Sequence, residues 1–168
     1  MSIKIRHERP ADVRAIAAVT EAAFRDEVYS SHTEQFIVDA LRRAGELTIS
    51  LVAEEGGEPV GHVAISPVKI SSGAQRWYGL GPISVQPDRQ EQGIGTQLMQ
   101  AALEQLRQLG GAGCVVLGEP AFYGRFGFVH HAELELPGVP AEYFQALAFE
   151  GSVPAGVVTY HEAFSATG

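Results

Sequence analysis

The hydrophobic pattern of the first 45 residues predicts one strand followed by two helices. Residues 3–6 alternate between apolar and polar side chains, as a half-buried strand does. From residue 10 to 24 apolar residues recur three and four apart, after a proline suited to a first helical turn. A second helix is expected from residue 33 or 34 to 43, ended by Gly45. The polar and aromatic link 26–32 is expected to form a mobile substrate loop.

The middle of the chain has a strand pattern. Residues 47–54, 59–71 and 75–86 are rich in β-branched and other apolar residues and are separated by short glycine-containing turns, at 55–58 and 71–74. Short turns join antiparallel neighbours, so this part is predicted to be an antiparallel meander.

The pattern then changes to strand, helix, strand. An amphipathic helix is expected over 93–109 and a short buried strand over 114–117, which makes the fourth and fifth strands parallel neighbours. A short helix at 121–126, a strand from Phe128 and a last strand over 157–164 complete the prediction. The fold class is α+β, a mixed α/β arrangement with one sheet covered by helices.

Length and composition exclude several protein classes. The 168 residues suit one domain, 1–168, that needs neither disulfides nor a structural metal. A net charge of −8 argues against general binding to nucleic acid or to an anionic membrane, and it weakly favours a cationic acceptor. No apolar run approaches the ~20 residues of a membrane span, and residues 1–10 lack a signal-peptide core. The single cysteine, Cys114, is expected to be a packed core thiol, which fits a cytoplasmic protein.

The most informative segment links the fourth strand to the following helix. It reads Gln90-Glu91-Gln92-Gly93-Ile94-Gly95-Thr96. The first N–H groups of a helix lack partners within it, and glycines let an anion approach the backbone closely. This segment is therefore predicted to bind a phosphorylated ligand. The dinucleotide fingerprint is incomplete, because Leu98 occupies the place of its third glycine, and the Gly-Lys-Ser/Thr of a P-loop is missing.

Three motifs resemble those of the Gcn5-related N-acetyltransferases (GNAT), and they follow one another along the chain as they do in the family. The turn has the pattern Gln90-x-x-Gly93-x-Gly95. The opening reads Ile5-Arg6-x-Glu8-x-Pro10-x-Asp12-x-x-x-Ile16, like the family's first strand and helix. The third motif is Phe122-Tyr123-Gly124-Arg125-Phe126-Gly127-Phe128, and with the preceding Gly118-Glu119-Pro120-Ala121 it is most similar to the small bacterial YhbS-like branch.

This resemblance implies a GNAT-like fold and a cosubstrate. The fold would be a mostly antiparallel mixed sheet of six or seven strands, with a splayed parallel pair (the fourth and fifth) and about four helices. Acetyl-CoA would be the acyl donor, with no metal. Its pyrophosphate would lie on the backbone N–H groups of Gln90, Glu91, Gln92, Gly93, Ile94, Gly95 and Thr96. Its pantetheine would pair with Ile83, Ser84 and Val85 of the fourth strand.

The resemblance also implies a general acid and leaves the general base open. Tyr123 aligns with the family tyrosine that protonates the departing thiolate, and this role is favoured over the competing interpretation that it packs as core with the neighbouring phenylalanines. Many family members carry a glutamate on the fourth strand, and residues 76–85 contain none. Candidates for the base are a water chain or one of four residues, Glu119, Glu27, Glu34 and His62. Glu119 is as readily explained as a helix N-terminal carboxylate.

Two hypotheses about function follow, one an enzyme and the other a binding protein. The first is an acetyl-CoA-dependent N-acyltransferase that transfers the acetyl group directly to an amine, and the second is a non-catalytic acyl-CoA-binding regulatory module. A nucleotide-binding protein is a third, less favoured reading. The acceptor amine cannot be identified from the sequence. His130 and His131, taken as neighbours on a strand, would face opposite sides of it and are not expected to bind a metal together.

A homodimer is also predicted as an option, formed through an edge strand at 157–164.

Overall fold

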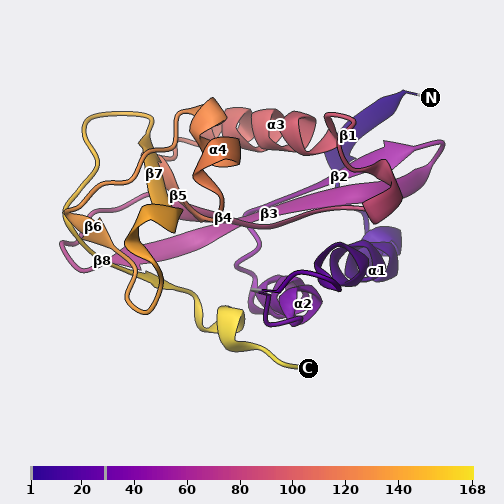
Figure 1. The fold of residues 1–168 in the computed structure, drawn as a ribbon, viewed down its shortest axis with the longest axis horizontal. Coiled ribbons are helices and arrows are strands. Elements are labelled where there is room, and N and C mark those ends of the chain that lie inside the picture. The colour runs from indigo at the N-terminus through magenta and orange to yellow at the C-terminus, as the bar shows by residue number, and fades with distance from the viewer. Residues whose placement is uncertain (1, 29) are drawn as a thin grey trace.

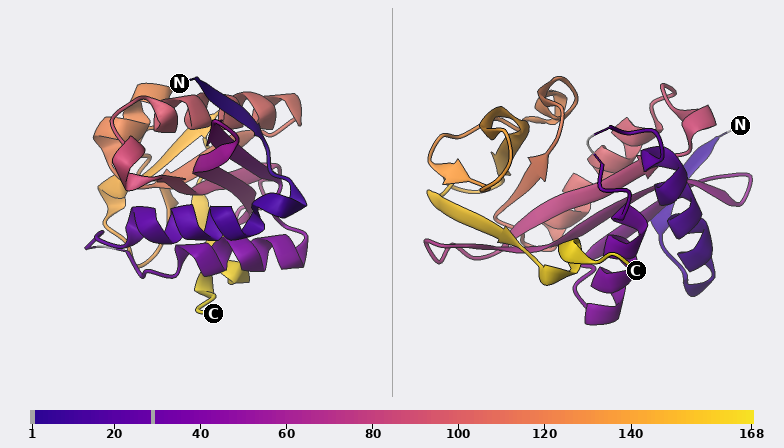
Figure 2. Two further views of the ribbon diagram at one scale, coloured as in Figure 1. Left: turned by 90° about the vertical axis from the view of Figure 1, so that its right-hand side faces the viewer. Right: turned by 60° about the horizontal axis from the view of Figure 1, so that its bottom comes forward.

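The computed structural model describes residues 2–28 and 30–168. A central sheet carries α3 on one face and α1 with α2 on the other (Figures 1 and 2). The strands are β1 (Ile3–His7), β2 (Ile49–Glu55), β3 (Glu58–Ile70), β4 (Trp77–Val85), β5 (Gly113–Leu117), β6 (Leu134–Glu135), β7 (Phe144–Ala148) and β8 (Gly156–Tyr160). The helices are α1 (Val13–Phe24), α2 (Glu34–Ala44), α3 (Ile94–Gln108) and α4 (Pro120–Tyr123).

The strand order confirms the predicted mixed sheet. The main path runs β1-β2-β3-β4-β5-β7, and β8 joins through β3 and β6. Strands β2, β3 and β4 form the expected antiparallel meander, and α3 connects β4 to its parallel neighbour β5. The sheet has eight strands because β6, β7 and β8 extend it beyond the crossover. Among the described residues, every helix is too short or too polar to cross a lipid bilayer.

The parallel pair β4 and β5 separates after a short contact. Pairing covers only Trp77–Gly79 of β4 with Gly113–Val115 of β5. Further along β4, Leu80 and Ile83–Val85 pair with β3 alone, and the register shifts between them. At the closed end the Trp77 ring lies against Gly113, where an added Cβ would be 2.3 Å from the ring. The splay expected from the family resemblance is therefore present, with a tightly packed end and an open end.

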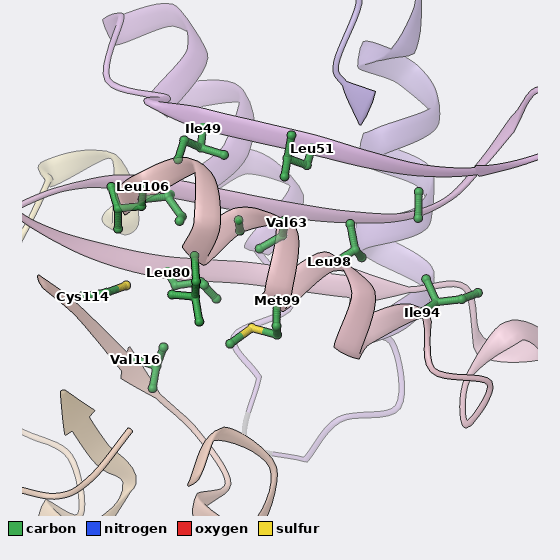
Figure 3. Close-up of a cluster of buried hydrophobic side chains, with 14 of the residues drawn as sticks. Ile49, Leu51, Val63, Leu80, Ile94, Leu98, Met99, Leu106, Cys114 and Val116 are labelled. Carbon is green, nitrogen blue, oxygen red and sulfur yellow. The ribbon is translucent and has the colours of Figure 1, made fainter. Parts of the chain in front are cut away.

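The larger apolar core lies between the sheet and α3 (Figure 3). Leu98, Met99 and Leu106 of α3 are fully buried against β2, β3 and β4. Cys114 belongs to the same cluster and is inaccessible to solvent, so burial raises the pKa of its thiol. The prediction of a packed core thiol is confirmed. On the opposite face Ile16 and Val38 pack against Val52.

Sequence reasoning was least accurate after residue 127. No strand begins at Phe128; Val129 makes one isolated bridge to Ala146, and His130 and His131 lie outside any strand. The strand β7 was missed, although it pairs along its whole length with β5. The last strand was predicted to reach residue 164 but ends at Tyr160. A 3₁₀ helix follows over Glu162–Ser165, because Ala163 packs onto α2 instead of extending the sheet.

A buried polar network lies beneath the sheet on the α1/α2 face. His62 is inaccessible to solvent, and its Nε2 lies 2.7 Å from the Ser50 hydroxyl. Ser50 donates its one proton to Glu8, which also accepts from Arg42 at 2.8 Å. The imidazole therefore carries its proton on Nε2, and Nδ1 has no partner among the described residues. Burial lowers the pKa of His62 to about 4.

We expect His62 to make folding pH-dependent on the acid side of neutrality. Its folded pKa of about 4 lies below the ordinary value of 6.5, so the unfolded chain takes up the proton first as the pH falls. The stabilisation is complete above about pH 6.5 and decreases toward pH 4, by up to about 3 kcal/mol. Urea unfolding at several pH values measures this loss.

The matched variant is His62→Gln, whose amide donates to Ser50 and does not titrate. Its stability should change less between pH 6.5 and 4.5 than that of the wild type. Equal pH dependence of the two proteins would show that another group is responsible.

Candidate active site

A cavity lies where β4 ends and α3 begins. Its volume is about 640 Å³. Segments far apart in sequence form its wall: the end of α1, the last residues of β4, the turn before α3 and the motif after β5. The lining residues are Ala23, Phe24, Glu27, Ile83, Ser84, Val85, Arg89, Gln90, Glu91, Gly93, Ile94, Gly95, Thr96, Phe122 and Arg125. All the predicted cofactor-binding residues except Gln92 line this cavity.

The turn presents the free end of α3 to the cavity. Gly93 is the residue before the helix and has φ +83°. Because glycine has no side chain, it cannot cap the free N–H groups of the helix. The first hydrogen bond within the helix runs from the Gln97 N–H to the Gly93 carbonyl, at 3.1 Å. The preceding N–H groups of Ile94, Gly95 and Thr96 therefore have no helical acceptor. An anion in the cavity would meet these donors and the positive end of the helix dipole.

The open end of β4 forms a second wall. Ser84 is 3% exposed, and its hydroxyl lies 3.3 Å from that of Thr20 in α1. The Val85 carbonyl accepts a hydrogen bond of 3.1 Å from the Gln90 side chain. This contact joins the strand end to the turn, so the two surfaces that face the cavity are held together.

Tyr123 lies beside the cavity, outside the set of residues that line it. Its ring packs over Gly118, where an added Cβ would be 2.5 Å from the ring. Edge contacts with Phe122 and Phe128 hold the ring at centroid distances of 5.0 and 6.1 Å. Burial raises the pKa of Tyr123 to about 12, so the phenol is neutral and able to donate a proton.

The four candidates for the general base lie in different surroundings. Glu27 lines the cavity. Glu119 is exposed and accepts a hydrogen bond from the Ala121 N–H at 3.3 Å, which is the contact of a helix-capping residue. Glu34 accepts from Ser30 at 2.6 Å, and His62 is buried in the network described above. Only Glu27 of the four lines the cavity.

The predicted substrate loop, residues 26–32, is described in part. Residue 29 lies outside the described residues, so the loop's role in binding an acceptor stays a prediction. Glu27 continues from the end of α1, with its N–H donating to the Phe24 carbonyl at 3.1 Å. Phe24 and Glu27 thus place an aromatic ring and a carboxylate on the same wall.

Sequence reasoning left two arginines of the cavity wall without a definite role. Arg89 was not among the predicted site residues, and Arg125 was considered only as part of the third motif. In the fold both line the cavity. The signal available in the sequence was their position: Arg89 directly precedes the glycine turn, and Arg125 lies within the third motif.

Comparison with known proteins agrees with this geometry. Residues 14–128 match the model of the acetyltransferase (GNAT) family. The chain belongs to the GNAT family. The resemblance inferred from the three motifs is thereby confirmed, and the match spans the cavity from α1 to the aromatic motif after β5.

Two GNAT relatives cover nearly the whole chain, and one of them, YhbS, matches both by sequence and by solved structure. The N-acetyltransferase YhbS of Escherichia coli K12 is 36% identical over 168 residues, which is 96% of this chain and 98% of that protein. A GNAT acetyltransferase from Brucella melitensis, solved in complex with acetyl-CoA, is 52% identical with a TM-score of 0.87, covering 97% of this chain and 98% of that one. The structure of E. coli YhbS in complex with CoA is 35% identical with the same TM-score, covering 99% and 93%.

The Gly93 conformation yields a stability prediction for this GNAT turn. Gly93→Ala places a Cβ on a residue with φ +83°, which costs about 1–2 kcal/mol in the left-handed region. The matched control is Gly124→Ala, at φ −58° with no atom within 4 Å of the added Cβ. We expect the control to change stability by less than about 0.5 kcal/mol. Chemical denaturation of both variants tests this, and equal losses would contradict it.

Proposed function

We propose that the protein is an acetyl-CoA-dependent N-acyltransferase that transfers the acetyl group directly to an amine. The observation that carries the proposal is the cavity in which the uncapped start of α3 and the unpaired edge of β4 meet. The start of α3 suits phosphates, and the free edge of β4 suits an extended chain with amide groups. CoA has both parts, its pyrophosphate and its pantetheine. The relatives solved with acetyl-CoA and CoA support the same ligand.

The binding roles follow from the donors available. Backbone N–H groups from Gln90 to Thr96 would hold the pyrophosphate, and the strand residues Ile83, Ser84 and Val85 would pair with the pantetheine amides. An added Cβ at Gly95 would be no closer than 3.7 Å to any neighbouring side chain. The chain's own packing therefore does not require glycine there, whereas a phosphate close to the backbone would.

The chemistry needs no covalent enzyme intermediate. The acceptor nitrogen attacks the thioester carbonyl carbon and forms the new C–N bond, while a backbone N–H near Ile83 to Val85 stabilises the oxyanion. Collapse of this intermediate breaks the C–S bond, and Tyr123 donates its proton to the leaving sulfur. Tyr123 suits this role because its phenol is neutral near pH 7 and can donate its proton as the thiolate develops.

For the proton lost by the amine, we propose Glu27 as the general base, directly or through water. Its place on the cavity wall supports this role, as does the absence of acidic residues on β4. The catalytic role predicted for Glu119 stays a prediction, and its hydrogen bond to Ala121 is the one expected of a helix cap.

The remaining expectations belong to the same proposal. The whole chain, 1–168, acts as one N-acetyltransferase domain in the cytoplasm, and the acidic balance favours a cationic acceptor. A homodimer through residues 157–164 stays a prediction; in the fold Val158–Tyr160 pair with β3, and the two residues before them pair with β6. The alternative, an acyl-CoA-binding regulatory module, would bind its ligand in the same cavity but would not need Tyr123 as a general acid.

Thermal unfolding tests the cosubstrate. Acetyl-CoA at ~100 times its dissociation constant stabilises by about 2.7 kcal/mol, which should raise the midpoint by several degrees. NADH and ATP serve as controls for a nucleotide site. A rise with either control and none with acetyl-CoA would exclude the proposed function.

Tyr123→Phe separates a catalyst from a binding module. The variant keeps the ring and its packing but loses the donated proton, so turnover with an acceptor found by screening amines should fall by about a hundredfold or more. Acetyl-CoA affinity should be retained. The control is Tyr143→Phe, which removes the hydroxyl of an exposed tyrosine. A wild-type protein that binds acetyl-CoA and transfers to none of the amines supports the module, and an unchanged rate in the variant removes Tyr123 as the acid.

A further inference from the structure

The two arginines of the cavity wall differ in how their charge is balanced. Arg89 donates from Nε to Glu55 at 2.7 Å, and its Nη1 lies 3.3 Å from Asp88. Arg125 forms no ion pair with any carboxylate of residues 2–28 and 30–168. Its polar contact is a long one, 3.4 Å from Nη2 to the Thr96 hydroxyl. The cavity therefore contains one neutralised guanidinium and one uncompensated guanidinium.

The position of Arg125 is defined by aromatic rings. Its guanidinium carbon lies 5.9 Å from the Phe122 centroid and 5.6 Å from the Phe126 centroid, within cation–π range. These contacts and the Thr96 hydroxyl bring the group to the first turn of α3. It thus adds a whole positive charge to the side of the cavity where the helix already presents free N–H groups.

We propose that Arg125 binds a phosphate group of CoA, as the side chain that complements the backbone donors of the turn. A guanidinium offers a planar pair of donors that matches a phosphate, and a charge-assisted hydrogen bond is stronger than a neutral one. The inference rests on the proposed function, since it assumes that the cavity holds CoA.

The charge of the whole protein favours such a residue. The chain carries a net charge of −8, and two carboxylates, Glu27 and Glu91, line the same cavity. A polyanionic cosubstrate is repelled by this surrounding charge. Backbone dipoles supply partial charges only, whereas Arg125 supplies a full charge at the point of contact. The weak Thr96 contact is readily exchanged for a phosphate oxygen.

The test is a binding cycle with two proteins and two ligands. Wild type and Arg125→Gln are titrated calorimetrically with CoA and with dephospho-CoA, which lacks the ribose phosphate. If Arg125 binds the ribose phosphate, the variant loses about tenfold in affinity for CoA and nothing for dephospho-CoA. If Arg125 binds the pyrophosphate, the variant loses about tenfold for both ligands. Either result supports the proposal, and the pattern identifies the phosphate.

The matched control is Arg107→Gln. Arg107 is also exposed and stacked on an aromatic ring, 4.7 Å from the Phe149 centroid, but it lies in the last turn of α3 and outside the cavity. The control should bind both ligands as the wild type does, and Arg125→Lys should recover part of the lost affinity.

Three outcomes would overturn the proposal. The first is an Arg125→Gln protein that binds both ligands within about twofold of the wild type. The second is a loss of the same size in Arg107→Gln, which would indicate a general effect of charge. The third is a loss that rises with salt instead of shrinking, because a phosphate contact must be screened. If the wild type binds neither ligand, the proposed function itself fails.

Discussion

The site depends on where the pairing of β4 with β5 stops. A parallel ladder normally satisfies the backbone groups of both strands along their length. Here the ladder ends at Gly79 and Val115, and the rest of β4 keeps one edge free. Trp77 packed on Gly113 fixes the closed end. The two strands separate because their pairing stops at these residues, so the fold itself provides the space for the cavity.

The free edge gains its chemistry from the elements around it. The start of α3 supplies donors, the end of α1 and the residues after it supply Phe24 and Glu27, and the segment after β5 supplies an aromatic ring and a cation. Each comes from a different part of the chain. The core beneath α3 holds the turn, while the Thr20 and Ser84 hydroxyls join α1 to β4.

The turn and the meander were predictable because local patterns determine them. Glycine at position 93 is required by its φ of +83°, and alternating strands joined by short turns have few alternative pairings. The segment after residue 127 was not predictable, because β7 is specified by its fit against β5 and Ala163 by its fit against α2. For the same reason the sequence placed Glu119 near the chemistry and left Glu27 as one of several candidates, since only the fold shows which of the four candidates for the general base reaches the cavity.

Tyr123 and Gly118 form one structural unit. The ring occupies the volume that any side chain at position 118 would need, and the two residues are close in sequence. During evolution neither can change alone: a larger residue at 118 displaces the tyrosine, and a smaller residue at 123 leaves a hole beside the end of β5. We therefore expect glycine at position 118 to be inherited together with the tyrosine at position 123 across relatives.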